Sequence, residues 1–301
     1  MKALDVLIRR NVKLFFKEKG LFLTALITPV ILLVLYTTFL GRVYYDSLAA
    51  SVPEGIFISE KLLRGLVNGQ LVSSLLAVSS VTVGFTTSFL MVHDKAHGRY
   101  RDLLITPVKP STLATAYYVA ALISTLIITY SATLVCLIYL AFTGFFLSVL
   151  DVLLLVVDVT LLSLFGTALS AVISLFLSSQ GQISAIGSVV SSGYGFISGA
   201  YMPLASFGEG LRRAVMLLPG TYGTSLLRSH ATRGVLGEMR EEHAPEELIG
   251  AFSDMIDASI YFPSGVRVDT WVSYLILCGS IALLLAAYVL INASLEKKKH
   301  I

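Results

Sequence analysis

Charged residues and cysteines are scarce in this sequence. Charged side chains make up 14% of its 301 residues, whereas a soluble globular protein carries about 25%. The two cysteines, Cys136 and Cys278, both lie inside apolar runs. This placement argues against a disulfide framework and favours their interpretation as small hydrophobic residues.

A phosphate-binding loop is also absent. The sequence contains no G-x-x-x-x-G-K-[ST] pattern, and no other glycine-rich turn joins a lysine as that loop requires. We therefore expect this chain to bind no cofactor of its own. A function that consumes ATP would need a separate ATPase.

Long apolar runs are what the sequence has in abundance. Its mean hydropathy is +0.82, and runs of about 20 residues are long enough to cross about 30 Å of hydrocarbon. Because lipid admits only helices or closed barrels and these runs do not alternate, we predict an all-α polytopic membrane protein, a single domain over residues 1–301. The six predicted spans are residues 21–40, 71–92, 113–143, 152–177, 183–202 and 271–291.

The first 19 residues, MKALDVLIRRNVKLFFKEK, are basic and amphipathic. Leu4, Ile8, Val12 and Phe15 form one helical stripe, and the cations lie elsewhere around the wheel. The basic region is too long for a signal peptide. The pattern predicts a helix that lies on the membrane surface before the first span.

The distribution of lysine and arginine predicts the orientation. If both termini are cytoplasmic, the inner segments hold 13 Lys+Arg and 5 acids, and the outer segments hold 9 Lys+Arg and 13 acids. Cytoplasmic loops carry an excess of basic residues. We therefore predict that both termini are cytoplasmic.

A charged island, residues 93–111, separates spans two and three on the cytoplasmic side. His93 and His97 are four residues apart, as metal ligands on a helix are, but Asp94 replaces the required glutamate and no third ligand is nearby. A solvated loop is the plain alternative. Neither interpretation accounts for the apolar residues that follow.

The island continues with RDLLITP. A loop without a partner has little reason to hold Leu103, Leu104 and Ile105 together outside the membrane. A short amphipathic helix, stopped by Pro107 and Pro110, would instead insert into a groove on another protein. We predict such a coupling helix within residues 93–111.

The longest stretch outside the spans is residues 203–270. Its first part, through Arg228, is amphipathic and predicts a re-entrant segment that dips back into the membrane surface. Its second part, roughly residues 230–268, is acidic, and EELIGAFSDMIDASIYF within it predicts an amphipathic helix. Because about 40 residues rarely support a core of their own, we predict a small external cap.

The island resembles a segment of the type-2 ATP-binding-cassette (ABC) exporter permeases. Between spans two and three, members of this family carry acidic and basic residues, a glycine and a Leu-Leu-x-Thr-Pro ending. The residues that fit are Asp94, Lys95, Gly98, Leu103, Leu104, Thr106 and Pro107. The sequence departs at Ala96, Arg99 and Arg101, where an acid, a threonine and a glutamate are common.

A second block, residues 198–228, is similar to the family's stretch after span five. The matching residues are Gly199, Pro203, Leu204, Pro219, Tyr222, Leu227 and Arg228. With the six spans, the resemblance covers most of the chain. The acidic segment near residues 240–269 is longer than the family leads us to expect.

The resemblance implies a permease that works with two separate ATPase subunits, which would hold ATP and Mg. Two permease copies, with a homodimer favoured over a heterodimer, would pair in the cell membrane of a prokaryote. Closure of the ATPases would press on the coupling helix and rock the spans, exporting an amphipathic or hydrophobic cargo such as a drug, lipid or peptide. The contacts with the ATPase would be ionic at Arg99, Arg101 and Asp102, and apolar at Leu103 and Leu104. The full set of predicted ATPase-docking residues is Asp94, Lys95, Gly98, Arg99, Arg101, Asp102, Leu103, Leu104, Thr106 and Pro107.

Small residues are frequent in spans two and five. Ordinary helix packing within one subunit explains them, but the resemblance implies that these spans form the dimer centre and the substrate pathway. The residues concerned are Ser80, Gly84, Thr87, Ser188, Ser191, Ser192, Gly195 and Gly199. Both interpretations stay open from the sequence.

Two other functions are also open. A polysaccharide or glycolipid exporter of the same superfamily would line its path with aromatic rings. A proton-coupled carrier would use Asp158 in span four, although this acid could equally be hydrated or capped by the external segment. Catalysis is not expected, because His230 and His243 have no visible orienting pattern.

Overall fold

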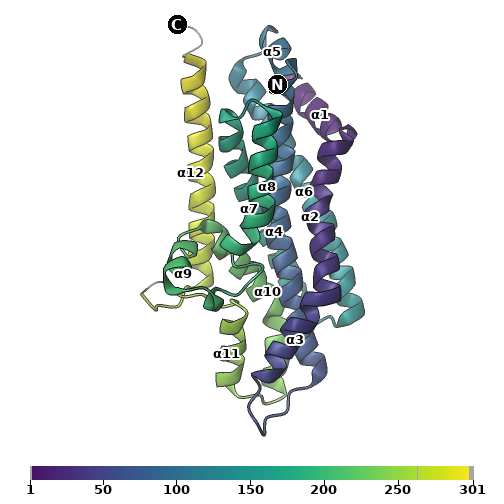
Figure 1. Ribbon diagram of the computed structural model, residues 1–301, viewed down its shortest axis with the longest axis vertical. Helices are drawn as coiled ribbons and strands as arrows, with labels where there is room; N and C mark the ends of the chain where they lie inside the picture. Colours follow the sequence, from purple (N-terminus) through teal and green to yellow (C-terminus); the bar gives the residue numbers. More distant parts are fainter. Residues whose placement is uncertain (1, 263, 298–301) are drawn as a thin grey trace.

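A computed structural model describes residues 2–262 and 264–297 as one elongated helical bundle (Figure 1). The long elements are α2 (Lys19–Leu35), which continues through a π-helix, η1 (Tyr36–Leu40), into α3 (Gly41–Ala50), then α4 (Glu60–Ala96), α6 (Pro110–Thr143), α7 (Val149–Phe176), α8 (Gln180–Ile197), α10 (Pro219–Glu241) and α12 (Thr270–Lys297). The shorter ones are α1 (Lys2–Lys17), α5 (Arg99–Leu104), η2 (Leu204–Ser206), α9 (Glu209–Val215) and α11 (Glu246–Met255).

Within the part of the chain that the structure describes, five helical stretches are long and apolar enough to cross a membrane. They are Lys19–Ala50, Glu60–Ala96, Pro110–Thr143, Val149–Phe176 and Thr270–Ser294. They coincide with predicted spans one, two, three, four and six. The prediction of an all-α polytopic membrane protein is therefore confirmed.

The predicted fifth span, residues 183–202, differs from the helix observed there. α8 has 18 residues and ends at Ile197, so it is about 27 Å long, slightly less than a hydrocarbon core. The chain then turns at Gly199, whose φ of +71° is a conformation that favours glycine. The predicted end at residue 202 is therefore wrong, and a sixth crossing stays a prediction.

Helix α4 forms the centre of the bundle. Its whole apolar stretch is buried because α2, α6, α7, α8 and α10 pack around it. It meets α7 with the backbones in close contact: a Cβ on Gly84 would lie 2.9 Å from Thr167 N, and one on Gly166 would lie 2.7 Å from Val81 Cα. Small residues thus let α4 serve as the core of the molecule.

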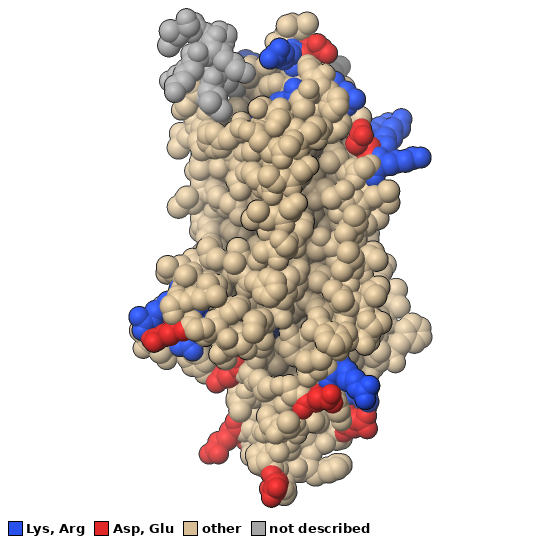
Figure 2. All heavy atoms as spheres, in the orientation of Figure 1, with Lys and Arg blue, Asp and Glu red and all other residues tan. Residues whose placement is uncertain are grey.

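The charged residues gather toward the two ends of the bundle. On the face shown in Figure 2, they flank a belt that carries none. We call the end that carries α5 the inner end and the end that carries α11 the outer end. Residues 298–301, part of the basic tail counted for the orientation, lie outside the described residues.

The N-terminal stretch forms the expected amphipathic helix. α1 packs along α6, with Leu7 and Phe15 buried and Val6 exposed. Its placement on a membrane surface stays a prediction.

The external stretch is more deeply embedded than an outer cap would be. Much of α10 is buried between α4, α7 and α12. Arg228 and His230, which lie on α10, are both buried. The prediction that places His230 in an exposed polar segment is therefore wrong, because α10 inserts into the bundle.

Candidate functional site

The charged island begins as a helix rather than a loop. α4 continues through His93 to Ala96 and ends at Gly98, whose φ of +79° breaks the helix. The six-residue α5 follows, and Pro110 begins α6. A short helix therefore lies between the glycine and the prolines, where the spacing predicts it.

Asp94, on α4, is buried and connects four helices through its carboxylate. Its carboxylate is fully buried and accepts hydrogen bonds from Tyr117 Oη at 2.7 Å, Arg10 Nη1 at 2.8 Å and Arg99 Nη1 at 3.4 Å. These donors come from α6, α1 and α5. A buried carboxylate is tolerable when donors surround it. Asp94 thus cannot touch an ATPase in this structure, and it positions α5 from inside.

Lys95 fastens the same end to α7. Its Nζ donates to the carbonyl oxygens of Ser174 at 2.9 Å, Leu175 at 3.1 Å and Leu177 at 3.2 Å. These oxygens belong to the end of α7 and the residue after it, where carbonyls lack helical partners and a cation is favourable. Lys95 therefore also acts inward, in contrast to the predicted docking contact.

The outward surface of the island includes Arg101, Asp102, Ile105, Thr106 and Pro107. Ile105 is 86% exposed. Sequence reasoning gave this exposed apolar position no role of its own, because a Leu-Leu-Ile run does not reveal which member faces out.

Leu103 and Leu104 are half-buried against a cluster that includes Leu7 and Phe15. They anchor α5 to the bundle. The groove-filling role predicted for them suits Ile105 better. Arg99 is partly exposed but bonded to Asp94.

The rings of the two island histidines are in contact, with centroids 4.2 Å apart and planes tilted by 34°. His97 Nδ1 lies 2.8 Å from the carbonyl oxygen of His93. Among the described residues, no group of three His, Cys, Asp or Glu side chains could hold a metal ion. The pair therefore has a local structural explanation.

The small residues of span two lie inside the subunit. Ser80 donates to Leu76 O, Gly84 contacts α7, and the Thr87 hydroxyl lies 2.8 Å from that of Thr125. All three are buried. The plain alternative, helix packing, accounts for them, and the predicted pathway role does not suit this conformation.

The small residues of α8 divide into two groups. Ser188, Ser191 and Ser192 are exposed on the outside of the subunit. Gly195 and Gly199 are buried, and the Tyr201 ring occupies the space that a Cβ on Gly195 would need. α8 therefore offers an outward face to a partner, which α4 does not.

Arg228 joins the re-entrant segment to the core. It is 1% exposed; its Nη1 lies 3.2 Å from Asp257 Oδ2, and its Nη2 donates to Ser74 Oγ at 3.0 Å, Gly199 O at 2.7 Å and Ala200 O at 3.1 Å. Burial raises the pKa of Asp257 to about 6, and the Arg228 guanidinium opposes that rise. Arg228 therefore connects α10, α4, the turn after α8 and the loop after α11.

The other predicted re-entrant residues have local roles. Pro219 begins α10, Pro203 precedes η2, and Tyr222 Oη donates to Met216 O at 2.8 Å. They shape the path of the chain between α8 and α10.

Asp158 is held by two partners from other helices. His230 Nδ1 lies 2.6 Å from one carboxylate oxygen, and Tyr274 Oη donates to the other at 2.7 Å. Asp151, on the same helix, pairs with Arg233 at 2.6 Å. His230 and Arg233 both lie on α10, so the predicted capping of Asp158 by the external segment describes the structure. The expectation that His230 lacks an orienting partner is wrong.

These features define a class of protein: a polytopic helical membrane protein with a short helix at its inner end that is tied to the bundle through a buried carboxylate. The model of the ABC-2 type transporter family matches residues 2–230. The chain therefore belongs to this family and is the membrane-spanning permease of an ABC transporter. A search of curated proteins found no match.

Proposed function

We propose that this permease exports an amphipathic or hydrophobic molecule, driven by ATP that a separate ATPase hydrolyses. The observation that carries the proposal is the attachment of α5. Asp94 ties α5 to α1, α4 and α6, and Lys95 extends the connection to α7. A displacement of α5 would therefore be transmitted to most of the bundle.

The ATPase docks on the outward surface of the island. Ile105 inserts into an apolar groove of the ATPase, and Arg101 and Asp102 form ionic contacts at its rim, as at other interfaces with an apolar centre. ATP and Mg bind in the ATPase, which is present in two copies. This arrangement keeps the inner end, with both termini, in the cytoplasm.

A second permease copy packs on the outward face of α8. Ser188 and Ser192 donate to backbone oxygens of their own helix, so the face has no unpaired hydroxyls at these positions and its small side chains permit close helix contact. Val189, 69% exposed, lies on the same helix. We favour a homodimer in the cell membrane of a prokaryote.

The test is copurification. Tagged permease, extracted from its native membrane, should bring down a protein with a phosphate-binding loop, and Ile105→Asp should abolish this. The matched control is Phe57→Asp, because Phe57 is 91% exposed in the loop between α3 and α4, on the chain segment farthest from α5 along α4. Docking on α5 is wrong if both variants retain the ATPase equally.

A further inference from the structure

A groove runs along α4 between α2 and α6. Both helices pack on α4, but they make few contacts with each other. Three successive cavities lie along this groove. Leu33 and Leu75 line both the first and the second, and Tyr36, Thr37 and Tyr139 line both the second and the third. The shared residues place the three cavities end to end along one path.

The part of the path nearest the inner end is apolar. It has a volume of about 170 Å³, and its walls come from Leu26, Pro29 and Val30 on α2 and from Val135 on α6, among others. Its polar wall residue, Ser131, donates its hydroxyl to Ile127 O of its own helix. Between Leu26 and Tyr36 the helix rises about 15 Å. These dimensions suit an alkyl chain.

A narrow neck follows, between Leu33, Leu75 and Tyr139. Its volume is about 10 Å³, roughly that of one water-sized sphere. A single chain fits such a neck far better than a fused ring system does. The neck therefore limits the shape of a ligand that could occupy both sides of it.

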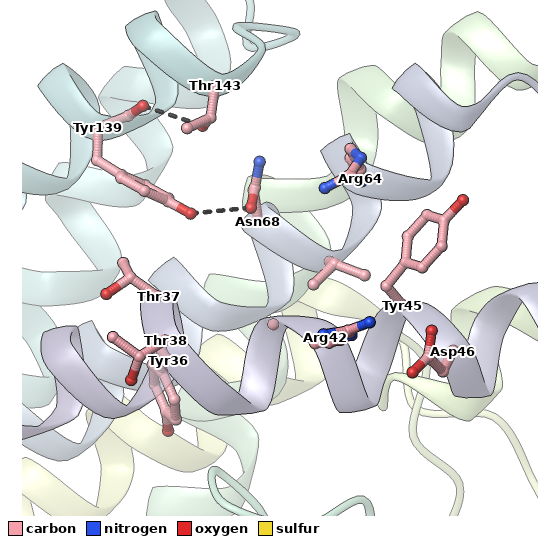
Figure 3. A pocket seen from close by; sticks show the side chains of 12 residues that line it. Tyr36, Thr37, Thr38, Arg42, Tyr45, Asp46, Arg64, Asn68, Tyr139 and Thr143 are labelled. Atoms are coloured by element: carbon pink, nitrogen blue, oxygen red, sulfur yellow. Dashed lines mark hydrogen bonds between the residues drawn. The ribbon is translucent and has the colours of Figure 1, made fainter.

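Beyond the neck, toward the outer end, the path opens into a polar chamber of about 560 Å³. Figure 3 shows Arg64, Asn68 and Tyr139 on one side of it and Arg42 and Asp46 on another. Tyr139 Oη donates to Asn68 Oδ1 at 3.1 Å, which leaves the amide nitrogen of Asn68 as a donor.

The chamber offers positive charge. Arg64 pairs with Glu60 and stacks over the Tyr45 ring at 5.1 Å, which fixes its position. Arg42 makes no hydrogen bond or ion pair with any residue that the structure describes. The lining thus has two guanidinium groups and one carboxylate, Asp46. Because Glu60 offsets the charge of Arg64, Arg42 is the cation that an anionic group would complement most directly.

The π-helix η1 lies where the apolar path becomes polar. π-helical turns are rare and frequently occur at functional sites. The hydroxyls of Thr37 and Thr38 donate to the backbone carbonyl oxygens Leu33 O and Val34 O, and so supply hydrogen bonds to carbonyls next to the π-helical turn. Because η1 joins α2 to α3 without a break, one continuous helical segment lines both the apolar and the polar part of the path.

We propose that this groove binds a membrane amphiphile, with its anionic headgroup in the chamber beside Arg42 and Arg64 and one alkyl chain threaded through the neck between α2 and α6. The lining changes along the groove in the same order as the ligand does: the apolar part and the narrow neck hold the alkyl chain, and the cationic chamber holds the headgroup. The site is formed by α2, η1, α3, α4 and α6, and it uses neither α5 nor α8. The inference therefore does not rest on the proposed docking or dimer surfaces.

The first test measures binding to the purified full-length chain by native mass spectrometry. A lysophosphatidylglycerol with one alkyl chain should bind as a single molecule per chain. A neutral glucoside with the same chain should bind about tenfold more weakly, since it lacks the charge-assisted hydrogen bonds. Inorganic phosphate should not displace the lysolipid. Equal binding of the neutral amphiphile, or displacement by phosphate, would overturn the proposal.

The second test fills the groove. Val135 lines the apolar part and is 48% exposed, whereas its neighbour Leu134 is 60% exposed and does not line it. Val135→Trp should weaken lysolipid binding by about tenfold or more, and Leu134→Trp should leave it unchanged. Equal effects of the two substitutions would show that the chain binds elsewhere.

The third test removes the positive charge. Arg42→Gln combined with Arg64→Gln should bring lysolipid binding down to that of the neutral glucoside. Arg213→Gln is the matched control, because Arg213 pairs with Glu209 four residues earlier, as Arg64 does with Glu60, at similar exposure and away from the groove. If the double variant binds like the control, the headgroup assignment is wrong.

Discussion

The two ends of this permease are both fastened by a buried carboxylate, but the carboxylates are paired differently. At the inner end, Asp94 is buried while its partners Arg10 and Arg99 keep 31% and 44% of their side chains exposed. Toward the outer end, Arg228 and Asp257 are both almost completely buried. Water can thus still solvate the cations at the inner junction, whereas the outer junction depends on its protein partners alone. The inner end is therefore the one that can rearrange at lower cost.

The largest effect is expected at the outer junction. Arg228→Met would leave Asp257 buried without its cation, at a cost of about 3–5 kcal/mol in the free energy of unfolding. Thermal unfolding of the purified protein should show this loss. Arg213→Met, at an exposed ion pair, should change stability by less than about 0.5 kcal/mol. If the two variants lose similar amounts of stability, the buried ion pair does not matter more than the exposed one, and the comparison fails.

A smaller effect is expected at the inner junction. Asp94→Asn keeps a partner for the Tyr117 hydroxyl, and Arg10 and Arg99 can turn to water, so we expect a loss of about 1–2 kcal/mol. Hydrogen exchange should also accelerate at residues 99–105, because α5 loses its tether. Asp5→Asn is the control, since Asp5 pairs with Arg9 on the surface. Unchanged exchange in α5 would contradict the positioning role of Asp94.

A third effect concerns pH and the outer junction. Burial raises the pKa of Asp257 from 3.8 to about 6, so between these values the folded protein retains a proton that the unfolded chain has released. The free energy of unfolding should therefore fall as the pH rises from about 4 to about 6, by about 3 kcal/mol, and this group should add no further slope above that range. Asp257→Asn should remove that part of the slope, and Asp254→Asn, at an exposed acid, should retain it. If the pH dependence of the free energy of unfolding persists in Asp257→Asn, another titrating group is responsible for it.

The sequence predicts the spans better than it predicts their contacts. Apolar runs locate the crossing helices, because lipid demands them, and the glycine and prolines locate α5. The partners of Asp94, however, lie 84 residues away at Arg10 and 23 residues away at Tyr117, and His230 lies 72 residues from Asp158. No local spacing encodes such pairs, which arise only when helices pack.

Spans two and five show the same limit. Both are rich in small residues, yet α4 is enclosed by its own subunit and α8 is largely exposed. Small side chains permit a close approach between helices but do not specify which helix approaches. Their composition therefore predicts that a contact forms and leaves the choice of neighbour to the tertiary structure.

The crossing of α4 with α7 has a mechanical consequence. Gly84 lies at a close contact between the two backbones, and along α4 it is about 15 Å from Asp94 and about 30 Å from Arg64. If α4 tilts about this contact, its two ends move in opposite directions, and the outer end moves about twice as far as the inner one. α4 is then a lever with unequal arms, whose short arm ends at the junction beneath α5 and whose long arm ends at the wall of the polar chamber.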